Sequence, residues 1–437
     1  MSERLLSSYF DRLDDVQPLK LRGRVQEVTG LVVRATVPEA SVGHVVRILP
    51  KHGPERLAEI VGFQGESAVL MPLGTVDGIG NDAEVESTLA PFSVRVGLGL
   101  KGRVLDGLGH PIDGGPPLTD GFEDWSIDRA PPHPLMRQRI EEPLPTGVRA
   151  IDGLLTFAKG QRIGLFAGSG VGKSTLLGQI ARGALADVNV ICLIGERGRE
   201  VRDFIEDVLG EEGLKRSVVV CATSDAPSLV RLKSAFVATA IAEWFRDRGA
   251  NVFLMMDSVT RFARAQREVG LAAGEAPARQ GYPPSVFAML PRLLERAGAG
   301  EVGTITALYT VLVAGGDMDE PIADEVRGIL DGHIILNRKI ASRNHWPAID
   351  VLASLSRVMR AVVSKSHTEY AGRLREIYAT YEAHRDLITL GAYEYGTDEK
   401  VDLSIDLIPE IDAVLRQDLD EWTSLEETVS RLGDIAG

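Results

Sequence analysis

The chain has 437 residues, of which 44% are hydrophobic and 25% are charged, and its formal net charge at pH 7 is −14. This length suits two or three domains, and the composition is that of an ordinary globular protein. The acidic balance disfavours nucleic acid as a partner, because only a local basic patch could attract its phosphates.

The sequence has none of the usual signs of export, membrane insertion or metal binding. MSERLLSSYFDRLDD, the N-terminus, carries charges where a signal peptide has its apolar core. No run approaches the roughly 18 apolar residues of a membrane span. Cys192 and Cys221 lie in apolar runs and are expected to be buried, reduced thiols, and the histidines are not spaced as zinc ligands. We therefore expect a cytoplasmic protein.

Residues 1–90 are predicted to form a first domain, in which a short arm precedes a small β-barrel. Residues 1–18 are polar and charged. After them come short strand-like runs with Gly or Pro between them: GRVQEVTGLVVRATV, VVRIL, AEIVGF and SAVLMPL. Residues 91–150 are rich in turn residues and are predicted to connect this domain to the next.

An α/β core is predicted within residues 91–367. From Gly160 onward, apolar strands alternate with helices, which indicates a mostly parallel sheet covered on both faces. The expected strands are QRIGLF, VNVICLIG, SVVVCAT, NVFLMMDS, ITALYTVLV and GHIILNR. Residues 368–437 are predicted to be a third, α-helical domain, with a glycine-containing break at GAYEYGTD and one long helical run after it.

A phosphate-binding loop is the strongest motif in the chain. It lies between an apolar strand and a helix, where backbone N–H groups at a helix N-terminus bind anions. The Walker A pattern G-x-x-x-x-G-K-[ST] is met except at its first position, which is Ala. The side chain of Lys173 would reach the β- and γ-phosphates, and Ser174 would hold Mg²⁺. The eight positions are Ala167, Gly168, Ser169, Gly170, Val171, Gly172, Lys173 and Ser174, and Thr175 follows them.

Hydrolysis needs further groups, and the ends of two strands supply candidates. Asp257 ends the strand NVFLMMDS, which is the Walker B position, and Glu196 with Arg197 follows the strand VNVICLIG. The carboxyl ends of parallel strands share one rim, so Glu196 could face the γ-phosphate and polarise the attacking water. The alternatives are an Asp that caps the next helix and a surface Glu–Arg pair.

Several motifs occur in an order that resembles a known ATPase family. Gly-Glu-Arg after the second strand is followed by MMDSVTRFARA, GYPPSVF and PAIDVLASLS, and the last is typical of the rotary ATP synthase α/β family and its relatives. Together they resemble the hexameric ATPase of type III protein export, found in injectisomes and in the flagellar export apparatus. The resemblance covers nearly the whole chain and implies a RecA-like P-loop core between the barrel and the helical domain.

The resemblance implies a role for each matching residue. Glu196 matches the catalytic carboxylate, with Arg197 beside it, and Asp257 matches the Walker B residue that reaches Mg²⁺ through water. Arg261, in SVTRFARA, matches a basic residue near the catalytic carboxylate. Arg357, in SRVMR, matches an arginine finger that reaches the nucleotide of the neighbouring subunit.

Two positions depart from common patterns. Trp346 stands where the family commonly has a Tyr that stacks on adenine, and the larger ring can still stack in a differently shaped pocket. Ala167 is shared with the export ATPases. The implied catalytic set is Lys173, Glu196, Arg197, Asp257, Arg261 and Arg357, and the implied nucleotide-binding set is the loop from Gly168 to Thr175 with Trp346.

The implied function is hydrolysis of ATP, with Mg²⁺, to release and unfold chaperone-bound export substrates. The implied partners are identical chains in a six-membered ring, a stator-type regulator, a central stalk, chaperone–substrate complexes and the export gate at the inner membrane, where association would be peripheral. GRVLDGLGHPIDGG and the short N-terminal arm favour an injectisome over a flagellar system.

Three other functions fit the sequence less well. A rotary ATP synthase subunit needs a partner chain of different sequence, and GYPPSVF argues against it. A nucleic-acid translocase needs aromatic side chains on its barrel for base stacking, and residues 19–90 contain only Phe63. A non-hydrolysing paralogue usually lacks the carboxylate that Glu196 provides.

Overall fold

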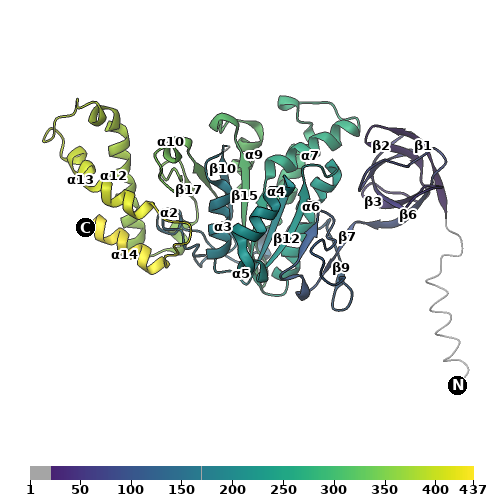
Figure 1. Cartoon of the computed structure of the whole chain (residues 1–437), viewed down its shortest axis with the longest axis horizontal. Helices are drawn as coiled ribbons and strands as arrows, with labels where there is room; N and C mark the ends of the chain where they lie inside the picture. The colour runs from purple at the N-terminus through teal and green to yellow at the C-terminus, as the bar shows by residue number, and fades with distance from the viewer. Residues whose placement is uncertain (1–20, 169) are drawn as a thin grey trace, which may run out of the picture. The chain divides into compact units, whose positions relative to one another are not determined.

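The computed structural model describes residues 21–168 and 170–437, so the predicted arm at residues 1–18 lies outside the described residues (Figure 1). These residues divide into two compact units. The first ends at Phe92 and includes Leu271–Glu275, and the second contains the rest. Within the described residues, no helix is long and apolar enough to cross a bilayer.

The first unit contains a closed antiparallel β-barrel, as predicted. Its strands follow the order β1-β2-β5-β4-β3-β6 around the barrel. Small and β-branched side chains such as Val33, Ala35 and Ile48 fill the interior and are fully buried, because alternate residues of a strand face the same side. The strands are β1 Arg22–Thr29, β2 Val32–Thr36, β3 His44–Leu49, β4 Arg56–Gln64, β5 Ser67–Pro72 and β6 Glu84–Pro91.

The second unit is built on a mostly parallel sheet in the order β17-β16-β10-β15-β13-β11-β12-β8, with β14 antiparallel to β15. Every residue of β11 is buried, which means that helices cover both faces of the sheet. The predicted parallel sheet is therefore confirmed. The strands are β8 Val104–Asp106, β10 Arg162–Ala167, β11 Val188–Glu196, β12 Ser217–Thr223, β13 Asn251–Asp257, β14 Gly298–Ala299, β15 Thr304–Leu312, β16 Gly332–Leu336 and β17 Leu355–Ser356.

The segment predicted to be a connection contributes to this sheet. Strand β8 pairs in parallel with β12 at the sheet edge, whereas β7 (Ser93–Val96) and β9 (Glu123–Ser126) form a separate two-stranded antiparallel sheet. Short strands between Gly- and Pro-rich turns leave little hydrophobic pattern to read. The helices around this sheet are α2 Arg149–Leu154, α3 Lys173–Gly183, α4 Gly198–Asp203, α5 Gly210–Lys215, α6 Ser228–Arg246, α7 Val259–Ala272, α8 Pro284–Leu294, α9 Pro321–Ile329, α10 Arg338–Ala341 and α11 Met359–Val362, and a π-helical turn, Phe204–Leu209, joins α4 to α5.

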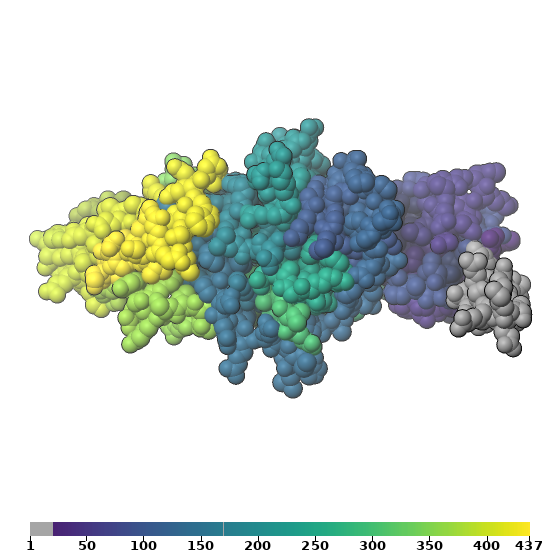
Figure 2. Space-filling model, turned by 90° about the horizontal axis from the view of Figure 1, so that it is seen from below, coloured from purple at the N-terminus to yellow at the C-terminus, as the bar shows by residue number. Residues whose placement is uncertain are grey.

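The C-terminal region is helical, as predicted, but its second helical run is broken. Helices α12 (Lys365–Thr389), α13 (Glu399–Leu415) and α14 (Leu425–Ala436) gather at one side of the second unit (Figure 2). Residues 416–424 between α13 and α14 are not helical. Leu432 on α14 is part of the same hydrophobic core as Ile151 on α2, so the C-terminal helices pack on the α/β part of the unit.

A buried arginine fastens the 416–424 loop to the start of α2. Arg149 is 3% exposed. Its guanidinium donates hydrogen bonds to the carbonyl of Val414 at 2.8 Å and the hydroxyl of Thr423 at 3.0 Å, and it forms an ion pair with Glu421. The guanidinium also donates to the carbonyl of Arg416. The loop is therefore held by polar contacts that a hydrophobic residue cannot replace.

Replacement of Arg149 by Met should lower the stability of the second unit by about 3 kcal/mol, because it leaves buried acceptors without a donor. Urea unfolding of the full chain measures this effect. Arg202→Met is the matched control, since the side chain of Arg202 is 77% exposed and pairs with Glu206 on the surface; its loss should cost less than about 1 kcal/mol. Equal destabilisation by the two variants would contradict the structural role of Arg149.

Candidate nucleotide-binding and hydrolysis site

The phosphate loop joins β10 to α3. Gly170 and Gly172 have φ values of 75° and 81°, a left-handed conformation that favours glycine. Gly172 is also needed for space, because a Cβ there would lie 2.8 Å from the ring of Trp346. Lys173 is the first residue of α3, so the loop leads directly to the free N–H groups of a helix N-terminus. Ser169 lies outside the described residues.

The structure brings the loop lysine together with both predicted carboxylates. Asp257 and Glu196 end the neighbouring parallel strands β13 and β11 and are 3% and 8% exposed. The ammonium of Lys173 donates to both carboxylate oxygens of Asp257, at 2.6 Å for Oδ2, and lies 3.8 Å from Oε1 of Glu196. These three charged groups converge at the C-terminal rim of the sheet, where ligands bind in open α/β sheets.

The backbone geometry before Glu196 directs its side chain toward this site. The β11–β12 register shifts between Ile194 and Glu196, and Gly195 has a φ of 64°. Such bulges re-aim side chains next to active sites. A Cβ at residue 195 would lie 3.1 Å from the Cδ atom of Arg261, so the glycine leaves room for the arginine to form an ion pair with Glu196.

The environment of Glu196 changes its acidity. Burial raises the pKa of Glu196 above its ordinary value, and the hydrogen bond from Arg261 partly opposes the increase. A carboxyl group with a raised pKa is a better proton acceptor when it is ionised. Arg261 therefore keeps a partly desolvated carboxylate available at the rim, in line with the predicted place of a basic residue beside Glu196.

Arg197 lies farther from the centre of the site. Its side chain is 79% exposed, and its Nη1 atom lies 2.7 Å from Oε1 of Glu200. Glu200 in turn is hydrogen-bonded to Glu196, which lowers the pKa of Glu200. In this structure Arg197 thus reaches the site only through Glu200, and its catalytic role stays a prediction.

Arg357 is placed away from the phosphate loop of its own chain. It follows β17, is exposed, and its backbone N–H donates to the carbonyl of Asp331 at 3.0 Å. Strand β17 pairs with the beginning of β16 at Gly332, whereas the loop leaves the sheet beside the end of β16 at Leu336. At about 3.3 Å per residue, this separates Arg357 from its own loop by roughly 13 Å along the strand.

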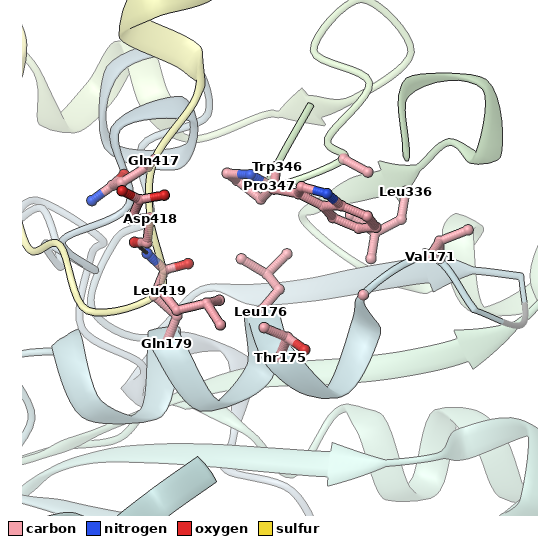
Figure 3. Close-up of a pocket in the computed structure, with 12 residues that line it drawn as sticks. Val171, Thr175, Leu176, Gln179, Leu336, Trp346, Pro347, Gln417, Asp418 and Leu419 are labelled. Atoms are coloured by element: carbon pink, nitrogen blue, oxygen red, sulfur yellow. Dashed lines mark hydrogen bonds between the residues drawn. The ribbon is translucent and has the colours of Figure 1, made fainter. Parts of the chain in front are cut away.

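A pocket of about 310 Å³ adjoins the phosphate loop (Figure 3). Trp346 lies on one side, opposite the first turns of α3, and the residue is 38% exposed. Gln417 and Leu419 of the 416–424 loop line a further side of the pocket. The backbone N–H of Gln417 donates to the carbonyl of Trp346 at 2.9 Å, which fixes the loop beside the ring. The pocket is lined by Val171, Gly172, Thr175, Leu176, Gln179, Leu336, Trp346, Pro347, Ala348, Gln417, Asp418 and Leu419.

Sequence reasoning missed Gln417, Leu419 and Thr310. The first two lie in the segment predicted to be part of a long helix. Thr310 donates from its hydroxyl to Oδ1 of Asp257 at 2.7 Å. Its sequence signal was a polar residue near the end of the apolar run ITALYTVLV, but polar residues also occur in buried strands for structural reasons.

The residues at the rim fit a Mg²⁺ ion that is held mainly by the nucleotide. Ser174 presents an exposed hydroxyl at the start of α3, and Asp257 presents carboxylate oxygens. Among the described residues there is no group of three or more His, Cys, Asp or Glu that could hold a metal ion by itself. Magnesium in nucleotide sites commonly has one or two protein oxygen ligands, with phosphates and waters completing its shell.

Comparison with family models covers most of the chain. The model of the nucleotide-binding domain of the ATP synthase alpha/beta family matches residues 147–356, and that of its beta-barrel domain matches residues 25–88. The model of the T3SS EscN ATPase C-terminal domain matches residues 363–434. The order of the three matches follows the order of barrel, sheet and helices in the structure.

Whole-chain relatives agree with these matches. The chain is 54% identical over 415 residues to the type 3 secretion system ATPase of Xanthomonas euvesicatoria, covering 94% of this chain and 93% of that protein. It is 52% identical over 432 residues to the flagellum-specific ATP synthase of Bacillus subtilis, covering 98% of each.

Solved structures show the same likeness. The assembled ATPase EscN of the enteropathogenic E. coli type III secretion system superimposes with a TM-score of 0.90 at 46% identity, covering 95% of this chain and 100% of that chain. The complex of EscN with its central stalk EscO gives a TM-score of 0.88 with the same identity and coverage. The chain therefore belongs to the ATPase family of type III secretion and flagellar export, a branch of the ATP synthase α/β family.

Proposed function

We propose that this chain binds ATP with Mg²⁺ at the rim formed by β11, β13 and the phosphate loop, and hydrolyses it to drive type III protein export. The observation that carries the proposal is the convergence of Lys173, Asp257 and Glu196. A lysine that bridges two buried carboxylates can bind an anion, because a phosphate group can replace the carboxylates as the partner of the ammonium group. The pocket beside Trp346 supplies the place for the base.

The chain's residues divide the work of hydrolysis. Lys173 leaves the carboxylates and binds the β- and γ-phosphates, and the N–H groups at the start of α3 bind the remaining phosphate oxygens. Glu196 orients the attacking water and accepts its proton, held in place by Arg261. Ser174 and Asp257 would hold the Mg²⁺ ion, Asp257 through water. When bound, this ion neutralises charge on the phosphates.

Arg357 acts on the neighbouring subunit. Its position at the opposite end of β16 keeps it away from its own loop, and the residue is exposed. A heterologous interface that repeats around a closed ring would bring it to the next site. We propose a ring of six identical chains, which the assembled EscN structure supports. Each interface then combines one chain's Glu196 with the next chain's Arg357.

The export role and its partners rest on the family. Hydrolysis would shift the interfaces and so release and unfold chaperone-bound export substrates, and a central stalk would bind the assembled chains, as EscO binds assembled EscN. We also propose that the chain binds a stator-type regulator and makes a peripheral contact with the export gate at the inner membrane. We favour the injectisome over the flagellar system on the sequence features given above.

Turnover measured against protein concentration tests the proposal. The chain alone should hydrolyse ATP with a specific activity that rises steeply with concentration, because sites are completed by self-assembly, and EDTA should abolish it. Flat, negligible turnover of the assembled ring with Mg²⁺ present would contradict the proposal.

Replacement of Trp346 by Ala tests the base pocket. Stacking on an aromatic ring contributes about 1–3 kcal/mol per base, so the Kd for ATP should rise about fivefold or more. The Kd for inorganic triphosphate, which has no base, should stay nearly unchanged, and Trp346→Tyr should preserve ATP binding. Isothermal titration of both ligands measures the difference. Equal losses for ATP and triphosphate would show that Trp346 does not stack on the base.

A further inference from the structure

Thr310 lies on β15 directly beside the end of β13. The two strands are parallel, and Met256 pairs with Tyr309, so the next residue of each strand, Asp257 and Thr310, are neighbours. Thr310 is fully buried. Its hydroxyl lies 2.7 Å from Oδ1 of Asp257 and 3.4 Å from the carbonyl of Met256.

The hydroxyl of Thr310 donates its single hydrogen bond to the carboxylate of Asp257. A hydroxyl has one proton to donate, and a hydrogen bond to a charged acceptor is shorter and stronger than one to a neutral carbonyl. The distances agree, since the carboxylate oxygen is the closer acceptor. Oδ1 of Asp257 therefore accepts from both Thr310 and Lys173, whereas Oδ2 accepts from Lys173.

Nucleotide binding is expected to affect the two hydrogen-bond donors to Asp257 differently. In the proposed function, on which this inference rests, Lys173 turns from Asp257 to the phosphates. The hydroxyl of Thr310 belongs to a strand of the sheet and, unlike Lys173, does not change its partner to a phosphate. Of the two side chains that donate to Asp257 among the described residues, Thr310 is thus the one that stays.

We propose that Thr310 is a positioning residue that holds Oδ1 of Asp257 after Lys173 has left, so that Oδ2 faces the hydrated Mg²⁺ ion of the bound nucleotide. Without the hydroxyl, a buried carboxylate rotates or takes another donor, and its water-mediated hold on the ion weakens. The binding of nucleotide with Mg²⁺ then suffers, whereas binding without Mg²⁺ does not.

The test compares Thr310→Val, Thr310→Ser and the control Thr306→Val in the full-length chain. Thr306 lies on the same strand, is also buried, and its hydroxyl accepts from the N–H of Gly160 at 2.9 Å, away from Asp257. The Kd for ADP is measured by isothermal titration with Mg²⁺ and again with EDTA. Thermal unfolding of each variant confirms that it is folded.

We expect Thr310→Val to raise the Kd for ADP with Mg²⁺ about tenfold, from the strength of a hydrogen bond to a charged group, with no change in EDTA. Thr310→Ser should restore wild-type binding, and Thr306→Val should bind like the wild type in both conditions. The proposal is overturned if valine at position 310 binds like the wild type, if it loses affinity equally with and without Mg²⁺, or if serine fails to restore binding.

The wild-type chain separates this inference from the function on which it rests. If the wild type binds ADP equally well with Mg²⁺ and in EDTA, the metal assignment of the proposed function is wrong, and the role of Thr310 falls with it. If the wild type depends on Mg²⁺ and the valine variant does too, to the same degree, only the role of Thr310 is wrong.

Discussion

Replacement of Glu196 by Gln should lower the kcat of the assembled ATPase at least about 100-fold, the usual contribution of a positioned general base, with little change in nucleotide affinity. Glutamine has the same shape and can still accept a hydrogen bond from Arg261, but it cannot accept the proton of the attacking water. Single-turnover hydrolysis and equilibrium binding, measured on the same preparation, separate the two effects.

The matched control is Glu206→Gln, because the side chain of Glu206 is 56% exposed and pairs with Arg202 on the surface. Its kcat should equal that of the wild type. The pH profile adds a second test. Burial raises the pKa of Glu196, so wild-type turnover should fall as the pH drops through that raised value, where the carboxylate becomes protonated. Unchanged turnover in Glu196→Gln would refute the assigned role.

Replacement of Arg357 by Ala should lower the kcat of the assembled form by about 1,000-fold or more, the range for arginine fingers in related phosphoryl transfer. The charge that develops on the transferring phosphoryl group would lose its partner from the adjacent chain. Nucleotide binding to the monomer should be unchanged, because Arg357 lies at the far end of β16 from its own phosphate loop.

Arg360→Ala is the matched control, since Arg360 is exposed and close in sequence to Arg357. It should leave both binding and turnover unchanged. If Arg357→Ala instead weakens nucleotide binding to the monomer at low concentration, the arginine acts within its own chain. An equal loss of turnover in the two variants would indicate a general loss of surface charge.

Much of this fold can be read from the sequence because its elements follow simple periodicities. Strand β2 of the barrel alternates between buried and less buried residues, and strand β11 of the core is mostly apolar and fully buried because both faces of the sheet are covered. The topology then explains why Glu196 and Asp257 meet, since both end parallel strands that share one rim.

Other features depend on contacts that a local pattern cannot show. The 416–424 loop interrupts what looks like one helical run, because Arg149 and the backbone of Trp346 hold it in a non-helical conformation. Strand β8 is too short to carry a pattern. Arg197 follows Glu196 in sequence, yet its exposed side chain pairs with Glu200, because the chain turns into α4 at that point.

A mixing experiment tests the central claim, that each site is shared by two copies of the chain. Glu196→Gln and Arg357→Ala chains are inactive alone in this account. In a random equal mixture, roughly one interface in four joins an intact Glu196 from one chain to an intact Arg357 from the next, as a repeated heterologous interface requires.

Turnover of the mixture should therefore rise well above the sum of the two separate variants, with co-assembly confirmed by native mass spectrometry. Mixed rings that form but show no such recovery would contradict the account, because they would place Glu196 and Arg357 of the same chain at one site.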